Sequence, residues 1–158
     1  MSDPICPADY VELAHRLADT AGPIVRKYFR TRLDVVSKTD ASPVTIADRS
    51  AEMAMRTLVS ARFPDHGIRG EEYGVHNPDA DWCWIFDPID GTKSFLSGSL
   101  CFGTQIGLTY KGRPVLGMID QPITKERWLG VAGEVTRLGD AAISTSAITE
   151  IRKANLYT

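Results

Sequence analysis

Two aspartates, Asp87 and Asp90, lie in the segment DPIDGT, which follows an aromatic and β-branched run. Gly91 permits a sharp turn after them, and Thr92 is a favourable residue for the start of a helix. These residues predict two carboxylates beside the free N–H groups of a helix N-terminus. Carboxylate oxygens are ligands that Mg²⁺ prefers, and helix N-termini favour anions such as phosphate. The segment therefore predicts a site for Mg²⁺ and phosphate.

The same residues also have ordinary structural explanations. Asp-Pro-x-Asp-Gly occurs in turns that carry no chemistry, and Thr92 alone is explained as a helix N-cap. Glu71, in the upstream segment GEEYG, adds an acidic residue that the turn does not account for. Asp48 is explained either as part of a helix cap or as a group that accepts a proton. The residue types alone leave these alternatives open.

Two helices are expected upstream of this segment. Apolar residues recur at three- and four-residue steps over residues 9–30, and Gly22-Pro23 is expected to kink that helix. A second helix is expected to start near Thr45, with Thr45 and Asp48 in the N-cap and third positions of a capping box. Small apolar residues on its face favour close packing on the first helix or on a sheet.

Strands are predicted mostly after the second helix. Aromatic and β-branched residues at 82–86 favour a buried strand. Pro88 is expected to end that strand at Asp87, because proline cannot donate to a sheet ladder. The downstream strands are joined by short turns such as Lys111-Gly112-Arg113, so they are expected to pair antiparallel. The other predicted strands are 33–37, 68–71, 102–110, 114–120, 126–131 and 135–138.

These elements indicate an α+β domain with two layers. The expected architecture is a mostly antiparallel sheet packed by two long helices on one face, formed by residues 1–138. Residues 139–150 are small and polar and are expected to form a linker. Residues 151–158 are expected to form a strand, so that 139–158 is a linker and the first strand of an absent or truncated C-terminal domain.

The composition excludes several classes of function. The 158 residues are 43% hydrophobic, which is enough for one core, and the net charge of −2 provides no basic surface for nucleic acid or anionic membranes. The sequence contains no apolar run that could span a bilayer and no signal-peptide pattern. Cys6, Cys83 and Cys101 are widely spaced, which disfavours disulfides or a zinc site and favours a cytoplasmic location.

Five segments carry a resemblance to a known family. GEEYG at 70–74 and DPIDGTKSF at 87–95 resemble the N-terminal signatures of the inositol-monophosphatase-like family, and VTIAD at 44–48 matches in order and spacing. FGTQIGL at 102–108 and GRPVLGMIDQPITKERWLG at 112–130 are most similar to histidinol-phosphate phosphatases within it. The resemblance implies the N-terminal half of the αβαβα fold of sugar phosphatases. The acidic WDxAAG-like motif of the second half is absent from this sequence.

The resemblance implies an enzyme that depends on two or three Mg²⁺ ions per site. It assigns Glu71, Asp87 and the carbonyl of Ile89 to the first ion, and Asp87 and Asp90 to the second. Asp87 would then bridge ions about 3.5–4 Å apart, as in other two-metal phosphatases. One ion would convert a water into the nucleophile, and the other would stabilise the leaving alkoxide.

The resemblance also implies the residues that assist the metals. Asp48, Thr92 and Glu71 would be catalytic: Thr92 would orient the attacking water, and Asp48 would accept its proton or hold the Thr92 hydroxyl. The N–H groups of Gly91 and Thr92 would bind phosphate oxygens. Glu72 would contact the metal ligands without binding a metal itself, or is simply a solvated residue.

The implied function is the hydrolysis of a phosphomonoester by metal-activated water, with histidinol phosphate as the expected substrate. One alternative is an inositol monophosphatase or a related sugar or nucleotide phosphatase. Another alternative, from a different class, is a catalytically deficient fragment that acts mainly in dimerisation. The expected partners are a small phosphorylated substrate and a second copy in a homodimer, without nucleic acid or membrane.

Overall fold

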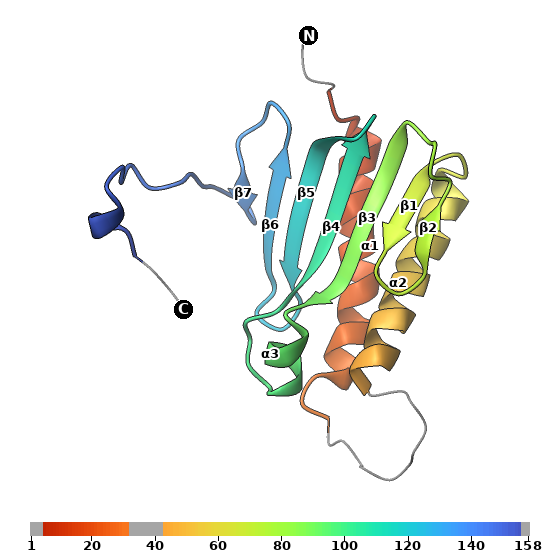
Figure 1. Ribbon diagram of the computed structural model, residues 1–158, viewed down its shortest axis with the longest axis horizontal. Coiled ribbons are helices and arrows are strands. Elements are labelled where there is room, and N and C mark those ends of the chain that lie inside the picture. Colours follow the sequence, from red (N-terminus) through yellow and green to blue (C-terminus); the bar gives the residue numbers. More distant parts are fainter. Residues whose placement is uncertain (1–4, 32–42, 156–158) are drawn as a thin grey trace.

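A computed structural model describes residues 5–31 and 43–155 of the chain. Two long helices, α1 (Ala8–Tyr28) and α2 (Pro43–Arg62), lie side by side on one face of a single sheet (Figure 1). The predicted two-layer α+β architecture is confirmed. From one edge to the other, the strands are β2 (Gly74–His76), β1 (Gly67–Gly70), β3 (Trp82–Asp90), β4 (Gly103–Tyr110), β5 (Arg113–Gln121), β6 (Glu126–Val131), β7 (Arg137–Leu138) and β8 (Ala141–Ala142).

The sheet is mostly antiparallel, as predicted. β1 and β3 pair in parallel, and the other neighbouring strands pair antiparallel. The predicted turn after β4 is confirmed: Lys111 and Gly112 connect β4 to β5 with φ angles of 50° and 76°. Positive φ at both residues suits a two-residue hairpin turn, because its twist matches that of the flanking strands.

Both helices begin within two residues of the positions expected from the sequence. α1 buries an apolar stripe that includes Leu13, Leu17 and Val25, and the helix contains Pro23. α2 begins at Pro43, two residues before Thr45, so a start near Thr45 is confirmed, but Thr45 lies within the helix and the predicted capping box is wrong. Proline is tolerated in the first turn of a helix because an N–H there has no intrahelical acceptor.

β3 continues past the point where proline was expected to stop it. The register between β3 and β4 shifts between Asp87 and Asp90, which lie opposite Gln105 and Gly103. Two residues of β3 therefore face one residue of β4, which is a β-bulge. Pro88 lies inside this bulge, where its missing N–H interrupts no ladder hydrogen bond. The predicted end at Asp87 is wrong because the bulge accommodates the proline.

Other differences concern short segments. β2 and β8 were not predicted, since strands of two or three exposed residues carry little hydrophobic pattern. Ile151–Lys153 form a 3₁₀ helix, η1, so the strand predicted from residue 151 is wrong there. An isolated strand is unstable without a neighbour, and within the described part of the chain no strand pairs with this segment. The predicted strand at 33–37 lies outside the described residues.

A short helix, α3 (Thr92–Leu96), follows β3 and begins at the predicted residue. Phe95 is its buried side chain and packs against Phe29 and Phe102, with ring centroids 5.5 and 5.0 Å away. This aromatic cluster holds α3 in place at one end of the sheet. Among the helices that the structure describes, none has the length and apolar character needed to cross a bilayer.

Candidate active site

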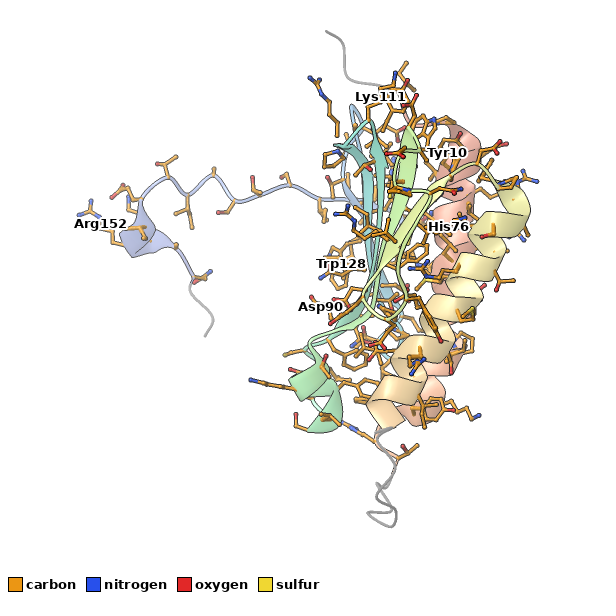
Figure 2. The ribbon with its side chains drawn as sticks, turned by 45° about the vertical axis from the view of Figure 1, so that its right-hand side comes forward. Tyr10, His76, Asp90, Lys111, Trp128 and Arg152 are labelled. Atoms are coloured by element: carbon orange, nitrogen blue, oxygen red, sulfur yellow. The ribbon has the colours of Figure 1, made fainter. Side chains whose placement is uncertain are left out.

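The parallel pairing of β1 and β3 brings two of the expected ligands to the same edge of the sheet. Gly70, the last residue of β1, lies beside Phe86 of β3, so Glu71 and Asp87 follow at the same level. β3 then passes through its bulge to Asp90, which lies close to α3 (Figure 2). The topology therefore gathers the three acidic residues at one end of the sheet.

α2 adds two buried carboxylates to this end of the molecule. Asp48 and Glu52 are one helical turn apart, and their exposed fractions are only 8% and 0%. The pKa of Asp48 is raised to about 7, first by burial and then by the negative charges of Glu72, Asp87, Glu71 and Glu52. The N–H of Glu72 donates a hydrogen bond to Glu52 Oε2 at 2.8 Å, so α2 lies close to the loop that follows β1.

Asp87 is the centre of this arrangement. Its pKa is raised to about 6, mainly by burial, then by the charges of Glu71 and Asp90, while the N–H of Ile89 lowers it. The Oδ1 atom of Asp87 is buried and has no hydrogen-bond partner among the described residues. We call the carboxylates that act on one another here the acidic group: Asp48, Glu52, Glu71, Glu72, Asp87 and Asp90.

The acidic group fits a divalent cation chemically. Leaving a buried polar atom without a partner costs about 1–3 kcal/mol, so Asp87 Oδ1 is a position where a ligand would be stabilising. Hard carboxylate oxygens are the donors that Mg²⁺ prefers. Within residues 5–31 and 43–155, no three acidic, histidine or cysteine side chains already surround a single point closely enough to bind a metal. The side chains thus share one region without converging on one point.

Two other expected site residues have partners of their own. The Gln105 side-chain amide donates a hydrogen bond to Asp90 Oδ2. The Thr92 hydroxyl donates to the carbonyl oxygen of Ile89 at 3.3 Å, which leaves that carbonyl one further lone pair. Of the described hydrogen bonds, none joins Thr92 to Asp48. The expected contact between their side chains therefore remains a prediction.

Gly91 shapes the turn between β3 and α3. Its φ of 91° lies in the left-handed region that glycine adopts without strain. A Cβ atom at residue 91 would lie 2.7 Å from the carbonyl oxygen of Cys101. Both observations explain why glycine occupies this position, next to the residues expected to bind phosphate.

Sequence reasoning missed Glu52 and Gln105. Glu52 accepts hydrogen bonds from the N–H groups of Glu72 and Tyr73, at 2.8 and 3.2 Å, and from Arg56 Nε at 2.7 Å. A charged residue four positions after Asp48, within a buried helical stripe, was the available signal. Gln105 had no such signal, because its contact depends on the register that the bulge sets.

Comparison with known proteins places these features in a family. The profile of the Inositol monophosphatase family matches residues 7–158. A bifunctional phosphatase, IMPL2, of Arabidopsis thaliana is 50% identical over 151 residues, which cover 94% of this chain and 44% of that protein. A histidinol-phosphatase of Chlorobaculum parvum is 41% identical over 141 residues, which cover 89% of this chain and 54% of that protein.

The fold agrees with the sequence match. A solved inositol monophosphatase from Zymomonas mobilis superposes with a TM-score of 0.82 at 48% identity, covering 90% of this chain and 56% of that one. The chain thus spans about half the length of these relatives. With its fold, its DPIDGT turn and its GEEYG loop, the chain belongs to the inositol monophosphatase family.

Proposed function

We propose that this chain takes part in the Mg²⁺-dependent hydrolysis of a small phosphomonoester, with histidinol phosphate as the substrate. The observation that carries the proposal is the buried, unpartnered Oδ1 of Asp87, which lies among other carboxylates. The identity of 41% to the histidinol-phosphatase of Chlorobaculum parvum supports the choice of substrate.

The proposed ligands of the cation are Glu71, Asp87, Asp90 and the carbonyl of Ile89. When bound, Mg²⁺ supplies Lewis-acid stabilisation of phosphoryl oxygens and makes a water acidic enough to attack phosphorus. Asp48 is proposed to accept the proton that this attack releases, and its burial on α2 close to Asp87 supports that role.

The turn before α3 is proposed to hold the phosphate. Gly91 has the backbone conformation that the turn requires, and the N–H groups of Gly91 and Thr92 precede the first hydrogen-bonded turn of α3. The Thr92 hydroxyl is fixed by its hydrogen bond to Ile89, which supports a role in orienting a water molecule.

A hollow beside this turn supports a small organic substrate. It has a volume of about 560 Å³ and borders Asp90, Gly91, Gln105, Glu126 and Trp128. Figure 2 shows Trp128 on the sheet face that points away from the helices. Histidinol phosphate carries an amino group that is a cation at neutral pH, and a carboxylate at residue 126 would attract it.

Phosphate release tests the proposal. We expect the purified chain to release phosphate from histidinol phosphate in the presence of Mg²⁺. We expect this release to stop when a chelator is added. We expect Asp90→Asn to lower the rate about a hundredfold or more, since removing even the outer partners of metal ligands costs 10–100-fold. The exposed Asp79→Asn is the control and should leave the rate unchanged. No phosphate release from any phosphomonoester would contradict the proposal.

A second substrate, inositol 1-phosphate, is supported by the identity of 48% to the inositol monophosphatase from Zymomonas mobilis. Inositol lacks an amino group, so the variant Glu126→Gln separates the two substrates. We expect Glu126→Gln to raise KM several-fold for histidinol phosphate and to leave KM for inositol 1-phosphate unchanged. Equal effects on both substrates would contradict the preference for histidinol phosphate.

We also propose that two copies of the chain form a homodimer in the cytoplasm. The three cysteines are free, which agrees with a reducing compartment. A molar mass from light scattering that equals one chain at all concentrations would contradict the dimer. A dimer without phosphatase activity would favour the alternative that the chain acts mainly in self-association.

A further inference from the structure

We propose that Glu52 and Arg56 are positioning residues that hold the loop carrying Glu71 and thereby set the affinity of the site for divalent cations. The proposal rests on the metal site proposed above. It concerns two residues of α2 that touch the loop between β1 and β2 and that need not bind the cation themselves.

Glu52 binds the backbone of this loop with both carboxylate oxygens. Its Oε2 accepts a hydrogen bond from the N–H of Glu72 at 2.8 Å, and its Oε1 accepts one from the N–H of Tyr73 at 3.2 Å. The Glu52 side chain is 0% exposed. A carboxylate buried to this extent is stable only when it is paired and hydrogen-bonded, and here the loop supplies two of the donors.

Arg56 supplies the compensating charge and a second tie to the loop. Its Nε lies 2.7 Å from Glu52 Oε1, and its side chain is only 12% exposed. Its Nη2 donates a hydrogen bond to the carbonyl oxygen of Gly74, where the loop enters β2. Its guanidinium also lies 5.9 Å from the ring centre of Tyr73. The ion pair therefore holds the loop on both sides of its tip.

Gly70 makes this contact possible. A Cβ atom at residue 70 would lie 1.9 Å from Glu52 Oε1 and 2.2 Å from its Cδ. Any side chain at this position would push α2 and the loop apart. The absence of a side chain at Gly70 thus lets Glu52 reach the N–H groups that follow Glu71.

The consequence falls on Glu71, whose own side chain is exposed. Its backbone is fixed before it by the pairing of Gly70 with β3 and after it by the hydrogen bond from Glu72 to Glu52. A ligand held in place before metal binding loses less conformational entropy when the ion arrives. Outer residues of this kind typically change metal affinity 10–100-fold when they are replaced.

The test compares Mg²⁺ binding by the purified chain, measured by titration calorimetry, for wild type and Glu52→Gln. The glutamine keeps the size of the side chain but replaces one acceptor with a donor that faces donors. We expect the dissociation constant for Mg²⁺ to rise at least tenfold. Glu12→Gln, at an exposed position on α1, is the matched control and should bind like wild type.

Hydrogen exchange of the Glu72 and Tyr73 amides, measured without Mg²⁺, gives a readout that does not depend on the metal. We expect both amides to exchange at least tenfold faster in Glu52→Gln, with unchanged exchange in the β4–β5 hairpin. An effect on overall folding would instead accelerate the amides of both regions. Arg56→Lys, which keeps the charge and loses the hydrogen-bonding fork, provides a second and milder variant.

The outcomes separate this proposal from the one before it. If wild type binds Mg²⁺ and both variants bind it equally well with unchanged exchange, the positioning role is wrong and the proposed function stands. If wild type does not bind Mg²⁺, the proposed function is wrong, and the effect on affinity is wrong with it. Faster exchange at Glu72 and Tyr73 together with weaker binding supports the proposal.

Discussion

The molecule contains two groups of partly buried charge, and they differ in how each charge is compensated. Near α1, Arg127 donates to Asp120 at 2.7 Å and to Asp19 at 2.8 Å, and it lies 3.2 Å from His15 Nδ1. The acidic group contains six carboxylates. In the described part of the chain, Glu52 is the member that forms an ion pair, and its partner is Arg56. We call the first set, Asp19, Asp120, Arg127 and His15, the compensated group.

This difference separates charges that stabilise the fold from charges that serve a site. In the compensated group, Asp120 is 5% exposed, and its Oδ1 lies 2.7 Å from Arg127 Nε, so the fold itself supplies the opposite charge. In the acidic group, the pKa values of Asp48 and Asp87 are raised to about 7 and about 6. Groups with such raised pKa values cluster at functional sites because a ligand, and not the fold, supplies the missing charge.

Breaking the compensated group should have the largest effect on stability. Arg127→Met leaves Asp120 buried without its partner, which we expect to lower the free energy of unfolding by about 3 kcal/mol. Urea unfolding at neutral pH measures this loss. Arg152→Met, which removes an exposed ion pair with Glu150, is the control and should leave stability unchanged within error. Equal effects of the two variants would contradict the comparison.

The acidic group should respond to pH in the opposite sense to an ordinary paired aspartate. The pKa of Asp48 is raised to about 7, so the folded protein holds its proton more tightly than the unfolded chain does. The contribution of Asp48 to stability is therefore lowest above pH 7 and rises as the pH falls through this pKa toward the ordinary value near 4. Relative to Asp48→Asn, we expect wild type to gain about 2 kcal/mol between pH 8 and pH 5.

The comparison with Asp48→Asn isolates this effect from the histidines. Burial lowers the pKa of His15 and of His66, so these two residues destabilise the fold as the pH falls. Their contribution is common to wild type and variant and cancels in the difference. A difference in stability that does not depend on pH would contradict the raised pKa of Asp48.

Replacing Asp87 should have the smallest effect on stability of these substitutions, and the sign of that effect sharpens the comparison. Asp87→Asn removes a charge that Glu71 and Asp90 repel, and we expect it to stabilise the fold at pH 8 by about 1 kcal/mol, since Asp87 is partly solvated. Asp120→Asn, by contrast, should destabilise the fold. Thermal unfolding of the two variants measures both signs, and the same sign for both would remove the distinction.

The sequence predicted the large elements because their patterns are long. The stripe at 9–30 corresponds to α1 (Ala8–Tyr28), and the strand at 126–131 corresponds to β6 (Glu126–Val131). It failed where a local rule was overridden by tertiary structure. Pro88 normally ends a strand, but the pairing of β4 with both sides of a bulge carries β3 on to Asp90.

In the candidate site, too, residues in a local sequence pattern were predicted and a residue with distant partners was missed. The DPIDGT turn identified Asp87 and Asp90, because the residue types needed for the turn and for the metal lie together in sequence. Glu52 was missed because its partners, Glu72 and Tyr73, come 20 and 21 residues later and use backbone atoms. A glutamate within a buried helical stripe indicates that hydrogen-bond partners are needed, but the structure alone shows that these are backbone groups of the loop after β1.

The bulge in β3 has a consequence for which side of the sheet each aspartate occupies. In a regular strand, residues an odd number of positions apart point to opposite sides, which would send Asp87 and Asp90 in different directions. Ile89 is 1% exposed and Asp90 is exposed, and Gln105, opposite Asp87, donates to Asp90. The extra residue thus reverses the parity of the strand and places both acids on one side. If the same residues of β3 paired regularly, without the bulge, Asp90 would point toward the helices, so the placement of the pair depends on the bulge as much as on composition.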